Sequence, residues 1–110
     1  MASFVTSKCR SLKGSIKVPG DKSISHRSIM LGSIATGITK VSGFLQGEDS
    51  LATLNSFREM GVQIDRRGSN VIINGVGMHG LKKPTKPLNL GNSGTSIRLM
   101  SGLLSAQNFD

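Results

Sequence analysis

The stretch GDKSISHR, residues 20–27, joins a glycine turn to the start of a helix. Pro19 stands before it, and a Pro-Gly pair turns a chain sharply because proline fixes φ and glycine accepts almost any value. Residues 14–18 predict a strand before the turn, and the apolar spacing after it predicts a helix over 24–36, ended by Gly37. A strand, a glycine turn and a helix start are typical of a phosphate-binding loop.

Three side chains strengthen the attraction of this turn for anions. A helix start already offers unpaired N–H groups and the positive end of the helix dipole. Lys22, Ser23 and Arg27 add a mobile cation, a hydroxyl and a forked cation. Lys22 and Arg27 converge only if Lys22 lies in the loop and Arg27 on the first helical turn. We therefore expect that placement, with Ser23 or Ser25 as the helix cap.

The rest of the chain alternates between strand and helix patterns. A second helix is predicted from the turn at 46–50 to Gly61, with Asp49 or Ser50 as its cap, and Asp49 is also placed to reach a neighbouring cation. Its apolar face carries Leu51, Leu54, Phe57 and Met60. The other predicted elements are short strands at 4–5, 38–45 and 88–90, a hairpin of 62–67 with 71–74, a loop over 75–87, and a helix over 99–106. From the strand at 14–18 onward, this is the order β-α-β-α-β-β followed by β-α.

Composition narrows the class of protein. The chain has 110 residues with 36% hydrophobic and 18% charged, which is typical of a globular domain or of a piece of a larger protein. The net charge of +8 comes from scattered Lys and Arg, and Trp and Tyr are absent, so small anions explain it better than nucleic acid. Cys9 is the single cysteine, and no run is long and apolar enough for a membrane helix or a secretory signal. We expect a cytoplasmic protein.

The first loop motif recurs later in the chain, which suggests a repeat. We call this recurrence the internal echo. A shift of 71 positions places Gly20 on Gly91, Ser25 on Ser96 and Arg27 on Arg98, with Asp21 opposite Asn92. Each copy is predicted to be a strand, a glycine turn, a hydroxyl-rich helix start, an arginine and an apolar helix. Two such loops predict two anionic groups bound near each other.

The chemistry of the second loop is again anion binding. Residues 92–96 offer an amide, three hydroxyls and Gly94, where the absence of a side chain lets a ligand approach the backbone. Neither loop has the Walker or the dinucleotide-binding pattern, and no His, Cys, Asp or Glu cluster has metal-ligand spacing. His26 is expected to be a packed or solvated side chain rather than a base, and Ser23 lacks the partners of a hydrolase triad. The sequence thus predicts anion binding without a nucleophile in view.

The two motifs carry a family resemblance. VPGDKSISHR at 18–27, followed by GNSGTSIR at 91–98, resembles the 5-enolpyruvylshikimate-3-phosphate synthase family, and the likeness runs from about residue 14 to the end, including 45–50. The sister family, UDP-N-acetylglucosamine enolpyruvyl transferase, has a Gly-Ala-Lys-Asn type of loop where this chain has Gly20 to Ser23. The resemblance implies an α/β (α+β) class of fold built from βαβαββ units, the inside-out fold of the enolpyruvyl transferases.

The resemblance also implies an activity. The family transfers the enolpyruvyl group of phosphoenolpyruvate to the 5-hydroxyl of shikimate 3-phosphate, in aromatic amino acid biosynthesis, without a metal or organic cofactor, and is the target of glyphosate. By motif match, Lys22 would contact both substrates and act as the catalytic residue of this segment. Ser23 and Arg27 would hold shikimate 3-phosphate. Asn92, Gly94 and Thr95 would form part of the phosphoenolpyruvate site.

This chain is much shorter than the members of the family, which are several times longer. The resemblance also implies that the full-length enzyme is a monomer. We therefore expect an N-terminal fragment that is inactive alone, in which residues 1–18 belong to the other domain, 19–87 form the first unit and 88–110 begin the second. The alternative is a small basic module that binds anions or nucleic acid at its present length. No nucleic acid or membrane partner is expected for the enzyme fragment.

Overall fold

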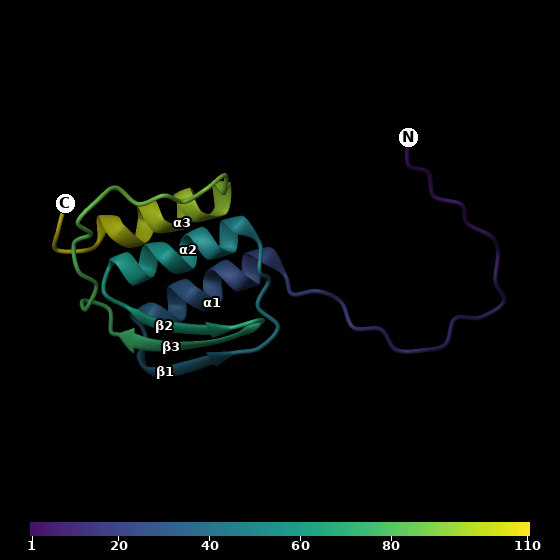
Figure 1. Ribbon diagram of the computed structural model, residues 1–110, viewed down its shortest axis with the longest axis horizontal. Coiled ribbons are helices and arrows are strands. Elements are labelled where there is room, and N and C mark those ends of the chain that lie inside the picture. The colour runs from purple at the N-terminus through teal and green to yellow at the C-terminus, as the bar shows by residue number, and fades with distance from the viewer.

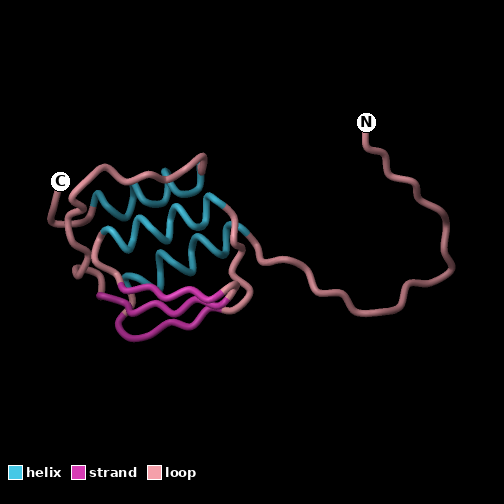
Figure 2. The backbone as a smooth tube through the Cα atoms, viewed as in Figure 1, coloured by secondary structure: helices cyan, strands magenta, loops and turns pink.

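The computed structural model describes residues 1–110, and it places helices over one face of a small sheet (Figures 1 and 2). The elements in chain order are α1 (Lys22–Ile34), β1 (Thr36–Val41), α2 (Glu48–Glu59), β2 (Gln63–Arg67), β3 (Asn70–Val76) and α3 (Gly94–Ser105). β3 is the central strand and pairs in an antiparallel manner with β1 on one side and β2 on the other. The predicted mixture of helix and sheet is confirmed.

The hydrophobic core lies between the sheet and the helices. In β2 and β3 alternate residues face inward, so that Ile64 and Ile73 are buried opposite each other while Ile72 remains 41% exposed. The helices contribute apolar side chains at helical spacing, and Phe57 of α2 is fully buried. The complete buried apolar cluster is Ile29, Met30, Phe44, Leu54, Phe57, Met60, Val62, Ile64, Val71, Ile73, Leu81 and Met100. Because Met100 belongs to α3, residues 88–110 share this core.

All three helices run in the same direction, with their N-termini at the same end of the molecule (Figure 1). The connections explain this arrangement, because β1 lies between α1 and α2 and returns the chain to that end. After α2, strand β2 runs toward that end and β3 runs away from it. The long segment over 77–93 then returns the chain to the start of α3 (Figure 1). Three sets of unpaired helix N–H groups are therefore gathered at one end. None of the helices is long and apolar enough to cross a membrane.

The N-terminal strand prediction is wrong for this chain. Residues 1–19 form no helix or strand and extend away from the helices and sheet (Figure 2), and Ile16 and Val18 are 88% and 69% exposed. A strand needs a partner for its backbone groups, and no strand of the sheet pairs with this segment. Residues 88–90 also form no strand. The observed order is α-β-α-β-β-α, so the predicted βαβαββ order is not seen.

The hairpin and the apolar face of α2 are confirmed, but several helix ends differ from prediction. Asp21 caps α1, because its carboxylate accepts a hydrogen bond from the Ile24 N–H at 2.7 Å, and the helix starts earlier than expected. Ala35 ends α1, and Gly37 lies in β1 with φ of 106°. Gly47 precedes α2 without a side-chain cap. The predicted start of the third helix at residue 99 was too late, since α3 begins at Gly94.

Candidate anion-binding site at the helix N-termini

The end of the molecule where the three helices begin contains an open hollow. Its volume is about 390 Å³, and it is bounded by the first residues of α1 and α2 and by the turn before α3. The lining residues are Lys22, Leu45, Gly47, Glu48, Asp49, Ser50 and Asn92. Two of the predicted site residues, Lys22 and Asn92, are therefore brought together from opposite ends of the sequence.

Lys22 is the first residue of α1, not a loop residue, and Arg27 lies on the second turn, so the predicted placement of both is wrong. The Lys22 Nζ lies 2.6 Å from Oδ2 of Asp49, which confirms that Asp49 reaches a neighbouring cation. The hydrogen bond from Lys22 holds the pKa of the Asp49 carboxyl below its usual value, and the Asn92 backbone N–H adds to this effect. Asp49 is thus an ionised partner of Lys22 and not the cap of α2.

Ser23 and Arg27 are exposed on α1 and do not line this hollow. The guanidinium of Arg27 donates a hydrogen bond to the Ser23 carbonyl oxygen at 3.2 Å. Arg27 also borders a separate groove of about 250 Å³, whose other lining residues are apolar and come from α1 and α3. The side chain of Arg27 therefore lies outside the Lys22 hollow, on the α3 side of α1.

The loop before α3 matches the loop before α1 in its details. Arg98 donates to the carbonyl of Gly94 at 3.1 Å, which repeats the Arg27 to Ser23 bond after the same shift of 71 positions. The Ser93 hydroxyl accepts from the Ser96 N–H at 3.0 Å and caps α3. Gly94 is exposed, and Thr95, the next residue, is half-buried. The internal echo thus has a structural counterpart at both helix starts.

His26 is packed, as expected, and it belongs to a polar network that the sequence did not reveal. Its side chain is fully buried, and its Nδ1 lies 2.8 Å from Oγ1 of Thr53 and 3.1 Å from Oγ of Ser96. Burial, followed by the charge of Lys22, lowers the pKa of His26 from its usual value, so the imidazole is neutral at pH 7. Sequence reasoning found Ser96 through the internal echo, but Thr53 carried no signal.

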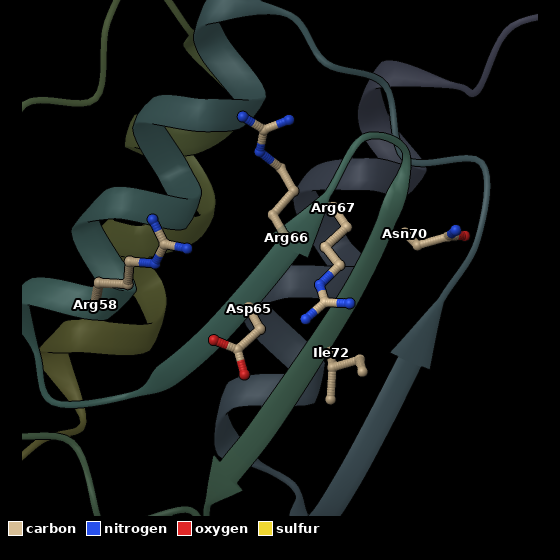
Figure 3. A pocket seen from close by; sticks show the side chains of 6 residues that line it. All are labelled: Arg58, Asp65, Arg66, Arg67, Asn70 and Ile72. Atoms are coloured by element: carbon tan, nitrogen blue, oxygen red, sulfur yellow. The ribbon is translucent and has the colours of Figure 1, made fainter.

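A second hollow, on the outer face of the sheet, carries arginines but none of the predicted site residues (Figure 3). Arg58 donates through Nε and Nη2 to the carbonyl of Ile64, and Arg66 donates to the side chain of Gln46. These cations are thus engaged in fixing the edge of β2. No three His, Cys, Asp or Glu side chains come together as metal ligands.

The fold and the site define a small α+β unit that gathers helix N-termini and a lysine around an open hollow. Comparison with known proteins shows the family to which this unit belongs. The sequence model of EPSP synthase (3-phosphoshikimate 1-carboxyvinyltransferase) matches residues 6–110, and the chain belongs to that family. This result favours the enzyme over the alternative of a small binding module.

Individual relatives agree with this assignment. The chain is 66% identical over its whole length to the 3-phosphoshikimate 1-carboxyvinyltransferase of Ruthia magnifica subsp. Calyptogena magnifica, and 62% identical over 109 residues to that of Geobacter sp. strain M21. It spans 25% of each of these proteins. Among solved structures, EPSP synthase from Acinetobacter baumannii superposes with a TM-score of 0.82 at 64% identity, over 87% of this chain and 22% of that chain.

Proposed function

We propose that this chain forms one side of the active site of an enzyme that transfers the enolpyruvyl group of phosphoenolpyruvate to the 5-hydroxyl of shikimate 3-phosphate. The observation that carries the proposal is the convergence of three helix N-termini with Lys22 and Asn92 around one hollow, in a chain of this family. Both substrates carry a phosphate and a carboxylate, and a cluster of helix N-termini favours such groups.

Within this proposal, Lys22 lies between the two substrates and contacts both. Ser23 and Arg27 bind shikimate 3-phosphate on the exposed side of α1, and Asn92, Gly94 and Thr95 bind phosphoenolpyruvate at the start of α3. The hydrogen bond from Arg27 to the Ser23 backbone carbonyl supports a shared role for these two residues, because it holds the guanidinium over the first turn of the helix. Substrate binding at this surface is expected in the cytoplasm, by a monomeric enzyme.

The test compares this chain with the full-length enzyme. We expect the enzyme to release phosphate only when both substrates are present, and the 110-residue chain to show no turnover, because it spans a quarter of its relatives' length and supplies part of the site. In an amide NMR titration of the chain with shikimate 3-phosphate, shifts at Lys22, Ser23 and Arg27 are expected to weaken as salt is added. Turnover by the chain alone would contradict the prediction. Tight binding of a random oligonucleotide with a steep salt slope would favour the binding module.

Replacing Gly94 by alanine is expected to crowd phosphoenolpyruvate while leaving the fold intact. A Cβ at this position would meet only the Arg98 guanidinium, with Nη1 at 2.6 Å and Cζ at 3.9 Å, and the end of that flexible side chain can move. We expect the KM for phosphoenolpyruvate to rise, and inhibition by the bulkier glyphosate to weaken more strongly. Gly102→Ala in the same helix is the control, because a Cβ there meets no atom within 4 Å. Equal glyphosate inhibition of Gly94→Ala and the parent would contradict the placement of Gly94.

A further inference from the structure

The buried imidazole of His26 is one corner of a triangle of polar groups that joins all three helices. Its Nδ1 lies 2.8 Å from Oγ1 of Thr53 on α2 and 3.1 Å from Oγ of Ser96 on α3, and these two hydroxyl oxygens lie 2.7 Å apart. All three side chains are fully buried. A polar group buried in this way is costly to leave without a partner, so the triangle fixes the separation of the helices.

The triangle needs a ring nitrogen at Nδ1, which accepts from or donates to a hydroxyl according to the tautomer. Each hydroxyl has one proton to donate, and a neutral imidazole has one acceptor and one donor nitrogen. When Nδ1 accepts, one hydroxyl donates to it and the other donates to the first hydroxyl, so both protons are used. The remaining nitrogen, Nε2, lies 3.5 Å from Oγ of Ser93, the residue that caps α3.

The triangle lies one helical turn below the residues that line the hollow. Lys22 precedes His26 by four residues, Asp49 precedes Thr53 by four, and Asn92 precedes Ser96 by four. Side chains four residues apart on a helix lie on the same face, one above the other. Asn92 stands just before the cap of α3, so it extends the same line beyond the helix end. Three of the residues that line the hollow, Lys22, Asp49 and Asn92, therefore each stand over one corner of the triangle.

We propose that His26 is a positioning residue of the substrate site, which, with Thr53 and Ser96, sets the distances between Lys22, Asp49 and Asn92. This inference rests on the proposed function, since it assigns His26 a role in the same site. The imidazole does not touch the substrates; it acts through the first turns of the helices. The charged groups that bear on it are Lys22 and Arg27, which disfavour its protonation, and Asp49, which favours it.

Two amide variants separate this role from simple core packing. Asn places an amide atom near the position of Nδ1, whereas the longer Gln places its amide near Nε2, away from Thr53 and Ser96. We expect His26→Asn in the full-length enzyme to retain the affinities for shikimate 3-phosphate and phosphoenolpyruvate. His26→Gln is expected to bind each substrate on the order of tenfold more weakly, because it loses one hydrogen bond between neutral groups and the geometry which that bond fixes.

The hydroxyl side of the triangle provides an independent variant. Thr53→Val keeps the shape of the side chain but removes the hydroxyl. It is expected to weaken the binding of both substrates as His26→Gln does. Ser33→Ala is the matched control, because Ser33 is a fully buried α1 hydroxyl near the opposite end of the helix with no hydrogen-bond partner. This control is expected to bind both substrates like the parent.

The readouts are the dissociation constants of the two substrates by calorimetry and kcat, both measured well below the melting transition. The melting temperature of each variant is determined separately by thermal denaturation. The inference is overturned if His26→Gln and Thr53→Val bind both substrates as tightly as the parent, whatever their melting temperatures. Loss of affinity in His26→Asn equal to that in His26→Gln would also overturn it. Failure of the proposed function is separate, since it would appear as an absence of shikimate 3-phosphate binding in the parent enzyme.

Discussion

Replacing Lys22 by alanine in the full-length enzyme is expected to weaken the binding of both phosphoenolpyruvate and shikimate 3-phosphate by about 10–100-fold each. A charge-assisted contact to a phosphate or carboxylate is lost from each complex, and such contacts account for changes of this size. The structure adds a second cause. Asp49 lies in the same hollow with its carboxylate 2.6 Å from the Lys22 ammonium, and in the variant it would face the anionic substrates with no cation beside it.

The contribution of Asp49 can be separated from that of the lost contacts. In Lys22→Ala/Asp49→Asn the repulsion is removed, so we expect this double variant to recover part of the affinity that Lys22→Ala loses. Asp49→Asn alone keeps the ammonium and serves as the matched control. Calorimetric titration of each substrate into the parent, the two single variants and the double variant measures the coupling energy between Lys22 and Asp49. Unchanged affinity of Lys22→Ala for either substrate would remove Lys22 from its shared position. A double variant as weak as Lys22→Ala would exclude repulsion by Asp49.

The parts of the fold that the sequence predicted well are those with strong local patterns. The apolar face of α2 appears at helical spacing. The end of the helix at Glu59 is signalled by Gly61, which follows the C-cap and adopts a φ of 91°. The hairpin is signalled by two strand-like runs around a short turn, with Gly68 at a φ of 59°. In both cases the residues that decide the structure lie next to one another in the chain.

The wrong predictions concern choices that depend on distant residues. Asp21, Ser23 and Ser25 are all good caps, and the sequence does not rank them. The structure uses Asp21, while the Ser25 hydroxyl donates to the Asp21 carbonyl and accepts from the Leu45 N–H, a residue of the loop before α2. The strand at 14–18 has a suitable pattern, but strand formation requires a neighbouring strand that pairs with it.

The sequence singled out residues at the mouth of the candidate site but not the buried hydrogen-bond network beneath them. Lys22 and Asn92 stand out because they belong to glycine-rich helix starts, and Asp49 because it is acidic at the start of a helix. Thr53 is one of several small polar residues on α2, and nothing in its local sequence distinguishes it. Thr53 is recognisable as part of the network only in the folded structure, where three parallel helices place His26 and Ser96 beside it, four residues after Asp49.

Replacing Gly20 by alanine is expected to destabilise the protein by about 1–3 kcal/mol, the cost of overpacking a site that cannot relax. The added Cβ would lie 2.0 Å from the carbonyl oxygen of Gly43 and 3.1 Å from the Leu45 nitrogen, and both are backbone atoms. The segment before α1 would have to move away from the loop before α2. That movement would stretch the Ser25 to Leu45 hydrogen bond, 3.0 Å long in the structure. The relative positions of Lys22 and Asp49 would change with it.

The matched control is Gly47→Ala, since Gly47 stands before α2 as Gly20 stands near the start of α1. Its φ of −88° suits any residue, and an added Cβ would meet no atom within 4 Å. We expect its melting temperature to stay near that of the parent, whereas Gly20→Ala falls clearly below both, in thermal denaturation of the full-length enzyme without ligand. Gly20→Ala should also bind shikimate 3-phosphate more weakly even at temperatures where it is folded. A Gly20→Ala protein as stable as Gly47→Ala would show that the loops before α1 and α2 are not in this close contact, and that another feature holds Lys22 beside Asp49.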